Sequence, residues 1–471
     1  MTLRAGEELR GKICGSTSYL AFISSVAALG GLLFGFDTVV ISGALSPLKS
    51  EFVLGNVLEG WLVSSALLGC AVGAAVAGII SDRFGRKPVL VFSSVLFVVG
   101  SLGCALAPNI AVLICARSLG GVGVGVASMV SPLYISEVSL PHLRGRLVTL
   151  FQLAITVGIC LALISNAWLE RMSIVTAATA PRGLYHWMVV DQVWRGMFAV
   201  ELVPSILFMC LCFVIPETPR WFVMAGSPER AKLVLSKVGG RRFAENQIIE
   251  IQGAVEHESG SITQLFKPGF RRALGVSLFL AVVSELSGVT VVLYYGPGIL
   301  ERAGLPIGTA LGGFVSIGVV NAIFTLIAIW LIDSVGRRPL LFIGNTGAFI
   351  ALLSCGLLLR SGHVEGKFLV SMLCLFMACF AFSMGPIKWV VISEIFPTRI
   401  RGRAAAIATL AVWVTDGLYN QLFPMVRGRI GVPGSFFVFA GILIPQFFFV
   451  WKIMPETKGR SLEEIEDLWA C

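Results

Sequence analysis

Apolar residues recur along this chain in long runs that are separated by short polar segments. About 20 apolar residues are enough for a helix to cross a bilayer, and twelve runs of that length are present. Lipid offers the backbone no hydrogen-bond partner, so each run must be helical. The pattern therefore predicts an all-α integral membrane protein. The predicted spans are residues 19–43, 58–80, 88–107, 110–134, 147–167, 193–215, 272–298, 308–332, 340–360, 367–393, 404–428 and 433–454.

Composition and charge agree with a membrane protein. Hydrophobic residues make up 56% of the 471 positions and charged residues only 13%, against about 25% charged residues in soluble domains. If the spans alternate in direction, 25 of the 36 Lys and Arg residues lie on the side of the termini and 9 on the other; Arg117 and Lys388 lie within spans. Positive residues favour the cytoplasmic side. We therefore expect a protein of the plasma membrane or the bacterial inner membrane with both termini on the cytoplasmic side. The net charge of +9 is explained by this topology and does not indicate a nucleic-acid partner.

One long polar stretch divides the chain into two halves. Residues 216–271 carry mixed charge with apolar spacing typical of short amphipathic helices, which we expect beneath the membrane. The expected organisation is a tail (1–18), a six-helix half (19–215), a linker (216–271), a second six-helix half (272–454) and a tail (455–471).

Three polar motifs occur once in each half, in the same order. Their spacings are 251, 257 and 239 residues, so the chain contains a duplicated six-span unit. Paired halves of this kind are typical of carriers in which the two halves rock around a central substrate site. The motif pairs are Asp82-Arg83-Phe84-Gly85-Arg86 with Asp333-Ser334-Val335-Gly336-Arg337, Ser136-Glu137…Arg144 with Ser393-Glu394…Arg401, and Pro216-Glu217-Thr218 with Pro455-Glu456-Thr457.

All three motifs fall on the predicted cytoplasmic face. Two interpretations are open: the charges form a gate that pairs across the halves when the inside is shut, or they only enforce topology and tight turns. The gate hypothesis covers Asp82, Arg83, Arg86, Glu137, Arg144, Glu217, Asp333, Arg337, Glu394, Arg401 and Glu456.

These motifs resemble those of the sugar porters of the major facilitator superfamily, over about residues 17–466. Residues 31–43 and 117–134 are most similar to the bacterial xylose–proton symporters. The resemblance implies twelve helices in two halves, alternating access, and a sugar or polyol as substrate with a proton as co-substrate.

Ionisable residues inside spans are costly unless paired, hydrated or functional. Asp37 lies in the first span and Arg117 in the fourth, and the resemblance implies that they couple transport to protons. Burial raises and a nearby arginine lowers the proton affinity of a carboxylate, so movement of Arg117 would switch Asp37 between proton binding and release. The alternative is a static ion pair between two helices.

The resemblance also implies substrate contacts from Gln152, Asn321, Trp389 and Trp413. Amide side chains donate and accept hydrogen bonds, and an indole offers an apolar face to a sugar ring. A lone amide in a span is otherwise an interhelical tie.

Five substrate-site positions depart from the family pattern. Ser284, Glu285 and Thr290 replace amides in the seventh span, Asp416 replaces an amide in the eleventh, and Lys388 precedes Trp389. Either an acid pairs with Lys388 for structural reasons, or the site accepts a charged, sugar-like solute such as an amino sugar.

Other features limit the remaining function classes. Tyr294 and Tyr295 resemble the family's outer gate, although interfacial anchoring is an equal alternative. No motif indicates an enzyme, a cofactor, ATP drive, a disulfide framework or a metal site. A facilitative uniporter and a non-transporting sugar sensor remain as alternatives. We expect a functional monomer, because both halves of the pathway lie in one chain.

Overall fold

The computed structural model describes residues 15–141, 143–178, 182–256, 270–362, 366–396, 398–454, 456 and 458. It does not describe the side chains of 254–256, 307, 329, 333, 393, 394 and 398–402. Every regular element in the described ranges is a helix, which confirms the predicted all-α fold.

The helices fall into an N-terminal half, a linker group and a C-terminal half. The N-terminal half contains α2 (Thr17–Phe52), α3 (Asn56–Phe84), α4 (Arg86–Ala105), α5 (Ile110–Val138), α6 (Arg144–Thr176), α7 (Leu184–His186), the π-helix η1 (Trp187–Asp191), α8 (Val193–Val200) and α9 (Leu202–Val214). The linker contains α10 (Pro219–Met224), α11 (Pro228–Gly239) and α12 (Arg241–Glu256). The C-terminal half contains α13 (Phe270–Leu286), α14 (Val289–Arg302), α15 (Ile307–Val335), α16 (Arg337–Ser361), α17 (Gly366–Phe382), α18 (Met384–Glu394) and α19 (Thr398–Lys452).

Twelve spans result from these helices. Within the described residues, eleven helical segments are long and apolar enough to cross a bilayer, and the last of them, Arg403–Lys452, contains 50 residues. A helix of 50 residues would measure about 75 Å at 1.5 Å per residue, more than twice the thickness of a bilayer core. Gly431 interrupts it with φ 72°, so α19 comprises two spans. The twelve predicted spans are confirmed.

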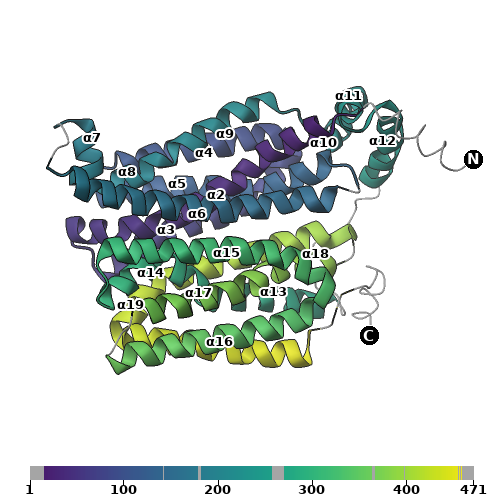
Figure 1. Ribbon diagram of the computed structural model, residues 1–471. Coiled ribbons are helices and arrows are strands. Elements are labelled where there is room, and N and C mark those ends of the chain that lie inside the picture. Colours follow the sequence, from purple (N-terminus) through teal and green to yellow (C-terminus); the bar gives the residue numbers. More distant parts are fainter. Residues whose placement is uncertain are drawn as a thin grey trace, which may run out of the picture.

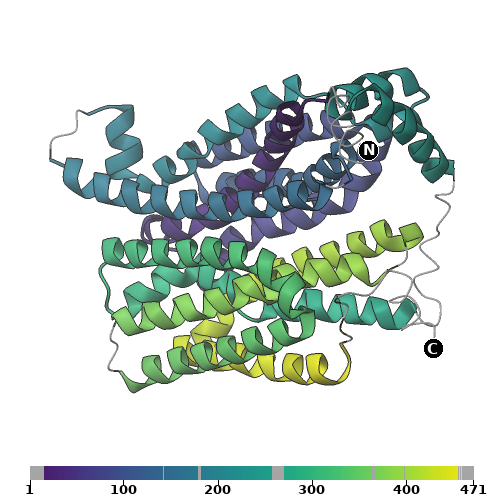
Figure 2. The ribbon, with the colours of Figure 1, turned by 45° about the vertical axis from the view of Figure 1, so that its right-hand side comes forward.

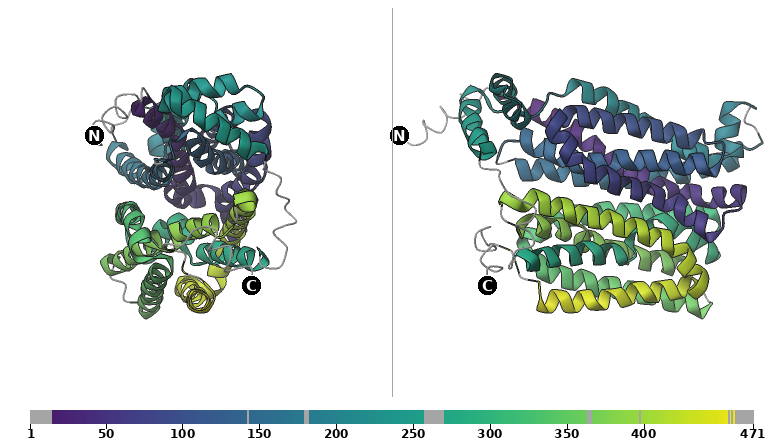
Figure 3. Two further views of the ribbon diagram at one scale, coloured as in Figure 1. Left: turned by 90° about the vertical axis from the view of Figure 1, so that its right-hand side faces the viewer. Right: turned by 180° about the vertical axis from the view of Figure 1, so that it is seen from behind.

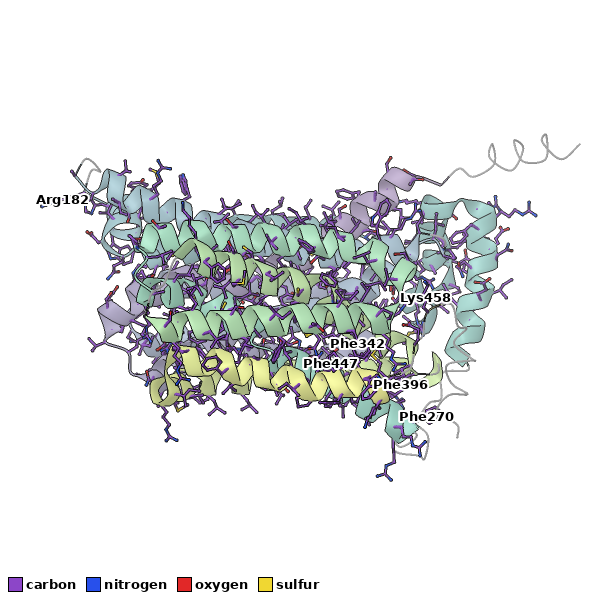
Figure 4. All side chains as sticks on the ribbon, turned by 60° about the horizontal axis from the view of Figure 1, so that its bottom comes forward. Arg182, Phe270, Phe342, Phe396, Phe447 and Lys458 are labelled. Atoms are coloured by element: carbon purple, nitrogen blue, oxygen red, sulfur yellow. The ribbon has the colours of Figure 1, made fainter. Side chains whose placement is uncertain are left out.

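The two halves lie side by side with their helices roughly parallel (Figures 1 and 2). Seen along the helices, each half forms its own group (Figure 3). Helices α10, α11 and α12 lie at one end of the bundle, called here the linker end; the opposite end is called the far end (Figure 1). Lys458, Phe270 and Phe396 lie at the linker end and Arg182 at the far end (Figure 4).

Three spans are broken, and each break lies beside a buried polar group. Helices α8 and α9 are separated at Glu201. Helices α13 and α14 are separated at 287–288, where Gly288 has φ 91°, a conformation that a side chain disfavours. Helices α17 and α18 are separated at Ser383. Broken helices near the bilayer midplane commonly line the substrate sites of transporters.

Candidate functional site

Asp37 and Arg117 are both buried in the core of the N-terminal half, on α2 and α5. Arg117 donates its Nε–H to the carbonyl oxygen of Leu62 at 3.0 Å, and its guanidinium lies 5.6 Å from the ring centre of Phe198. Within the described part of the chain, Asp37 Oδ2 and Arg117 Nη1 have no hydrogen-bond partner. The two groups interact electrostatically, but the closed ion pair of the static alternative is not formed.

Glu201 is a third buried ionisable group in this region, and the sequence interpretation missed it. It lies at the break between α8 and α9, is 1% exposed, and interacts electrostatically with Asp37 and Arg117. A signal was available, because Glu201 falls inside the predicted span 193–215. The N-terminal half therefore contains two carboxyl groups and one guanidinium at its centre.

A second charged cluster lies in the C-terminal half. Lys388 on α18 donates to Glu285 Oε1 near the end of α13, and both side chains are buried. The Lys388 ammonium also lies 5.3 Å from the ring centre of Trp389. The sequence left two alternatives for these positions, a structural ion pair with Lys388 or a site for a charged solute. The structure contains the ion pair. Each partner lies within two to five residues of a helix break.

Asp416 on α19 is held by neutral donors. Asn420 donates its amide to Asp416 Oδ1 at 2.7 Å and to Thr290 Oγ1 at 3.0 Å. Asp416 also interacts electrostatically with Glu285 and Lys388. With one base and two acids, the cluster retains one negative charge when both acids are ionised.

An aromatic contact joins the two charged regions across the halves. The rings of Phe34 on α2 and Trp413 on α19 lie 5.2 Å apart. Phe34 lies three residues before Asp37 and Trp413 three residues before Asp416, so each ring is on the same helical face as a buried acid. The structure thus brings the predicted Trp413 to the boundary between the halves.

The remaining predicted substrate contacts are more dispersed. Gln152 on α6 is half-buried, Asn321 on α15 is buried, and Trp389 is 37% exposed. None of these three side chains contacts another by a hydrogen bond that the structure describes. Ser284 is buried, and its hydroxyl donates to the carbonyl oxygen of Ala281 at 3.1 Å. Its hydrogen-bond donor is therefore used within α13.

Tyr294 and Tyr295 are both buried inside the protein. The Tyr295 hydroxyl donates to the carbonyl oxygen of Asn420 at 3.0 Å, and its ring lies 4.9 Å from that of Phe423. Side chains that anchor a helix at the membrane interface are exposed to it. Burial of both rings therefore disfavours the anchoring alternative.

At the linker end, the buried Arg86 is the centre of a charge network in the N-terminal half that extends to the exposed Asp82. Its Nη2 lies 2.9 Å from Asp82 Oδ1 and 3.1 Å from Glu137 Oε1, and Arg220 Nε lies 4.0 Å from Glu137. These described pairs lie within one half and its linker. Arg83 stacks on Phe84, and Arg144 donates to the carbonyl oxygen of Ser136 at 3.2 Å. The side chains of Asp333, Glu394 and Arg401 lie outside the described ones.

Glu217 and Glu456 bind helix N-termini at matching positions of the two halves. Glu217 accepts the backbone N–H groups of Arg86 and Lys87 at the start of α4, both at 3.0 Å. Glu456 accepts those of Arg337 at 3.1 Å and Arg338 at 2.9 Å, at the start of α16. The glycines before these helices, Gly85 and Gly336, have φ 101° and 105°. The predicted duplication of these two motifs is therefore confirmed in three dimensions.

The pKa values of these two carboxyl groups shift in opposite directions. Burial raises the pKa of Glu217, although three backbone N–H donors and Arg86 oppose the shift. Burial also raises the pKa of Glu456, but less of this side chain is removed from water. The backbone N–H groups of Lys458, Arg338 and Arg337 outweigh burial and lower its pKa overall. Among the side chains that the structure describes, neither group pairs with the opposite half, and both act as helix caps in this state. Among the residues that the structure describes, no cluster of His, Cys, Asp and Glu could hold a metal ion.

Comparison with known sequences gives a consistent assignment. The family model described as "Sugar (and other) transporter" matches residues 23–469. The chain is 39% identical to the arabinose-proton symporter of Bacillus subtilis over 458 residues, covering 96% of each. It is 36% identical to the D-xylose-proton symporter of Escherichia coli over 488 aligned positions, again covering 96% of each.

Solved structures give the same result. The chain matches a partially occluded inward open conformation of the xylose transporter XylE from E. coli with a TM-score of 0.82 and 34% identity, covering 94% of this chain and 100% of that one. It matches the proton:xylose symporter XylE bound to 6-bromo-6-deoxy-D-glucose with a TM-score of 0.78 and 35% identity, covering 96% and 99%.

Proposed function

Because this chain belongs to the sugar transporter family of the major facilitator superfamily, we propose that it carries a monosaccharide or polyol across the membrane together with a proton. It is a multi-pass membrane protein of twelve spans. Two similar halves surround a central pathway, which suits alternating access. The relatives named as arabinose-proton and D-xylose-proton symporters support a pentose or a related neutral sugar as substrate.

The observation that carries the proposal is the state of Asp37. Its carboxyl group is buried, one oxygen has no hydrogen-bond partner among the described residues, and Glu201 and Arg117 share the same region. A buried, ionised oxygen without a partner is unfavourable, and binding a proton removes its charge. When Arg117 moves closer, the ionised form is favoured and the proton leaves. Asp37 is therefore the proton carrier of the proposed cycle, and Arg117 controls its release.

The substrate lies between the halves in this proposal. Gln152, Asn321 and Trp389 supply the amides and the aromatic face, as the family resemblance implies, and Trp413 lies at the boundary with α2. The Lys388–Glu285 pair keeps α13 and α18 together at their breaks. With both charges neutralised by each other, the pair leaves room for a neutral sugar to be bound through hydrogen bonds.

An amino sugar is the second candidate, and one observation favours it. Asp416 is buried, and the side chains that donate hydrogen bonds to it among the described residues are neutral, those of Asn420 and Thr290. Since Lys388 pairs with Glu285, the negative charge of an ionised Asp416 is not matched by a base of its own. A solute with an ammonium group would supply the missing positive charge.

The orientation of the proposed carrier follows from its charges. Helices α10, α11 and α12 carry six of the Lys and Arg residues at the linker end: Arg220, Arg230, Lys232, Lys237, Arg241 and Arg242. By the positive-inside rule the linker end is cytoplasmic. A single chain supplies both halves of the pathway, so the monomer is the functional unit of this proposal.

Uptake of labelled pentoses, hexoses and glucosamine into proteoliposomes tests the function. We expect a neutral sugar to accumulate above equilibrium only when a proton gradient is imposed, and Asp37→Asn to abolish that accumulation while sparing counterflow exchange. A conservative change at an exposed carboxyl group, Glu250→Gln, serves as the control.

Each outcome separates the candidates. Equilibration that needs no gradient and survives Asp37→Asn would make this protein a facilitator. Accumulation of glucosamine alone, lost in Asp416→Asn, would replace the neutral sugar by the amino sugar. Absence of uptake for every sugar, with binding retained, would indicate a sensor.

A further inference from the structure

The far end of the molecule contains a buried ion pair between the two halves. Glu59 lies in the first turn of α3 in the N-terminal half, and Arg427 lies on α19 in the C-terminal half. Arg427 Nη2 donates to both carboxylate oxygens of Glu59, at 2.9 and 3.1 Å. The two side chains are only 1% and 6% exposed. This is a direct bond between residues that must move apart if the far end opens.

The surroundings of the pair close this end further. Ser64 donates to Gln421 Oε1 at 2.7 Å, which joins α3 to α19, and Ser46 donates to Glu301 Oε2 at 2.6 Å, which joins α2 to α14. The backbones also meet: a Cβ atom on Gly60 would lie 2.3 Å from the carbonyl oxygen of Gln421. Glycine at position 60 is therefore required for this approach.

Glu59 has a second partner that belongs to its own half. Lys49 on α2 donates to Glu59 Oε2 at 2.6 Å and is 26% exposed. The Arg427 guanidinium lies 5.8 Å from the ring centre of Tyr295 and 5.6 Å from that of Phe423. If the halves separate, Lys49 stays with Glu59, and Arg427 keeps its aromatic neighbours while its charge meets water. Neither charge is then left buried and unpaired.

We infer that Glu59 and Arg427 form an interlock that holds the far end shut while the central site faces the linker end, and that the pair separates in every transport cycle. A buried pair that loses one partner leaves an uncompensated buried charge, which is strongly unfavourable. Loss of one partner therefore disfavours the closed far end and shifts the population toward far-end opening. In this inference both residues are positioning residues, which act through their contact with each other across the halves.

The arrangement makes the two single variants unequal. Glu59→Gln leaves Arg427 and Lys49 together without their shared anion. Arg427→Met leaves Glu59 with Lys49, so less charge is uncompensated. The double variant removes the acid and one base, which leaves the partly exposed Lys49 and the exposed Arg302 of α14, which interacts electrostatically with both substituted positions. We therefore expect far-end opening in the order Glu59→Gln, then Arg427→Met, with the double variant below Glu59→Gln.

Alkylation of a cysteine placed beneath the interlock measures this opening. Ser64 is fully buried one turn and a half below Glu59 on α3, so Ser64→Cys reacts with a membrane-impermeant maleimide only when the far end opens. We expect Glu59→Gln to raise the labelling rate from the far-end side about tenfold or more. Arg429→Met, an exposed change two residues from Arg427, is the matched control and should leave the rate unchanged.

The ordering of the variants decides between an interlock and a general loss of packing. Equal rates in Glu59→Gln and Arg429→Met would overturn the inference, and so would a double variant that labels as fast as the two single effects combined. If Glu59→Gln does not fold, Arg427→Met and the double variant still give the required comparison. The inference rests on transport by alternating access, but labelling needs no sugar. A failure to find a transported sugar would thus be distinguishable from a failure of the interlock.

Discussion

Individual buried charges in this protein are held in two different ways. Glu285 and Lys388 neutralise each other directly, whereas Asp37 and Arg117 lie in the same region, and each has one atom without a hydrogen-bond partner among the described residues. A closed pair stabilises one arrangement, because separating it exposes two charges to a low-dielectric interior. An open pair can exchange a proton or a partner at lower cost. We therefore expect structural effects from changes in the first pair and coupling effects from changes in the second.

Variants of the Lys388–Glu285 pair test the structural half of this distinction. Glu285→Gln leaves a buried ammonium group unpaired, and we expect it to lower the free energy of unfolding by about 3–5 kcal/mol. The double variant Glu285→Gln/Lys388→Met should recover most of that loss. Thermal unfolding in detergent measures both effects.

A double variant as unstable as Glu285→Gln would contradict the structural role. A double variant that is stable and still binds no sugar would instead make the pair part of the substrate site.

At the scale of the elements, the repeated motifs have a local structural task. Glu217 and Glu456 each bind backbone N–H groups at the start of a helix, α4 and α16, just after a glycine with positive φ. Negative charge at a helix N-terminus interacts favourably with the helix dipole. In each half, the acid that follows the last span binds the first turn of a helix much earlier in the same half, α4 or α16. This capping explains why the acid recurs in both halves without requiring contact between them.

The helix cap at Glu456 has a pH signature. Its pKa is lowered by backbone N–H donors, so its stabilising contribution is present above the usual pKa of glutamate and is lost as the pH falls through the lowered value. Glu456→Gln should therefore cost about 0.5–1 kcal/mol at neutral pH and progressively less in acid.

Thermal unfolding of the parent and of Glu456→Gln, from pH 7 to pH 3, measures this dependence. Glu250→Gln, at an exposed position of α12, is the control. A difference that grows on acidification would contradict the capping role.

At the scale of the whole molecule, the two ends differ in what joins the halves. The far end has direct contacts between halves, of which Glu59 with Arg427 is the most buried. At the linker end, the described pairs of Arg86 and Glu456 lie within single halves. Contacts between the halves at the far end keep that end closed. This suits a carrier whose central site faces the linker end. The gate predicted at the linker end stays a prediction, since the side chains of its second-half acids are outside the described ones.

The orientation of these ends can be measured directly. Ser227 precedes α11 at the linker end, and Arg182 lies at the far end (Figure 4). We expect an impermeant maleimide added to intact cells to label Arg182→Cys and to spare Ser227→Cys until the membrane is dissolved. The reverse pattern would invert the proposed topology.

The sequence by itself determined the elements and the duplication. Apolar runs must form helices in lipid whatever their neighbours, so the twelve spans could be predicted one at a time. The recurrence of Glu217 at Glu456 likewise needs only the order of residues along the chain. The fold follows from these local facts and from the resemblance of the motifs to one family.

Only the tertiary structure decided which charges meet. Glu59 and Arg427 are 368 residues apart, and both lie near span ends, where polar residues are common. Glu201 was equally visible within a predicted span, yet its neighbours Asp37 and Arg117 come from two other helices. Lys388 had two candidate acids, and in the folded chain it donates to Glu285. The physical reason is the same in each case: hydrophobic runs specify where a helix lies in the membrane, but helix rotation and crossing specify which side chains face one another.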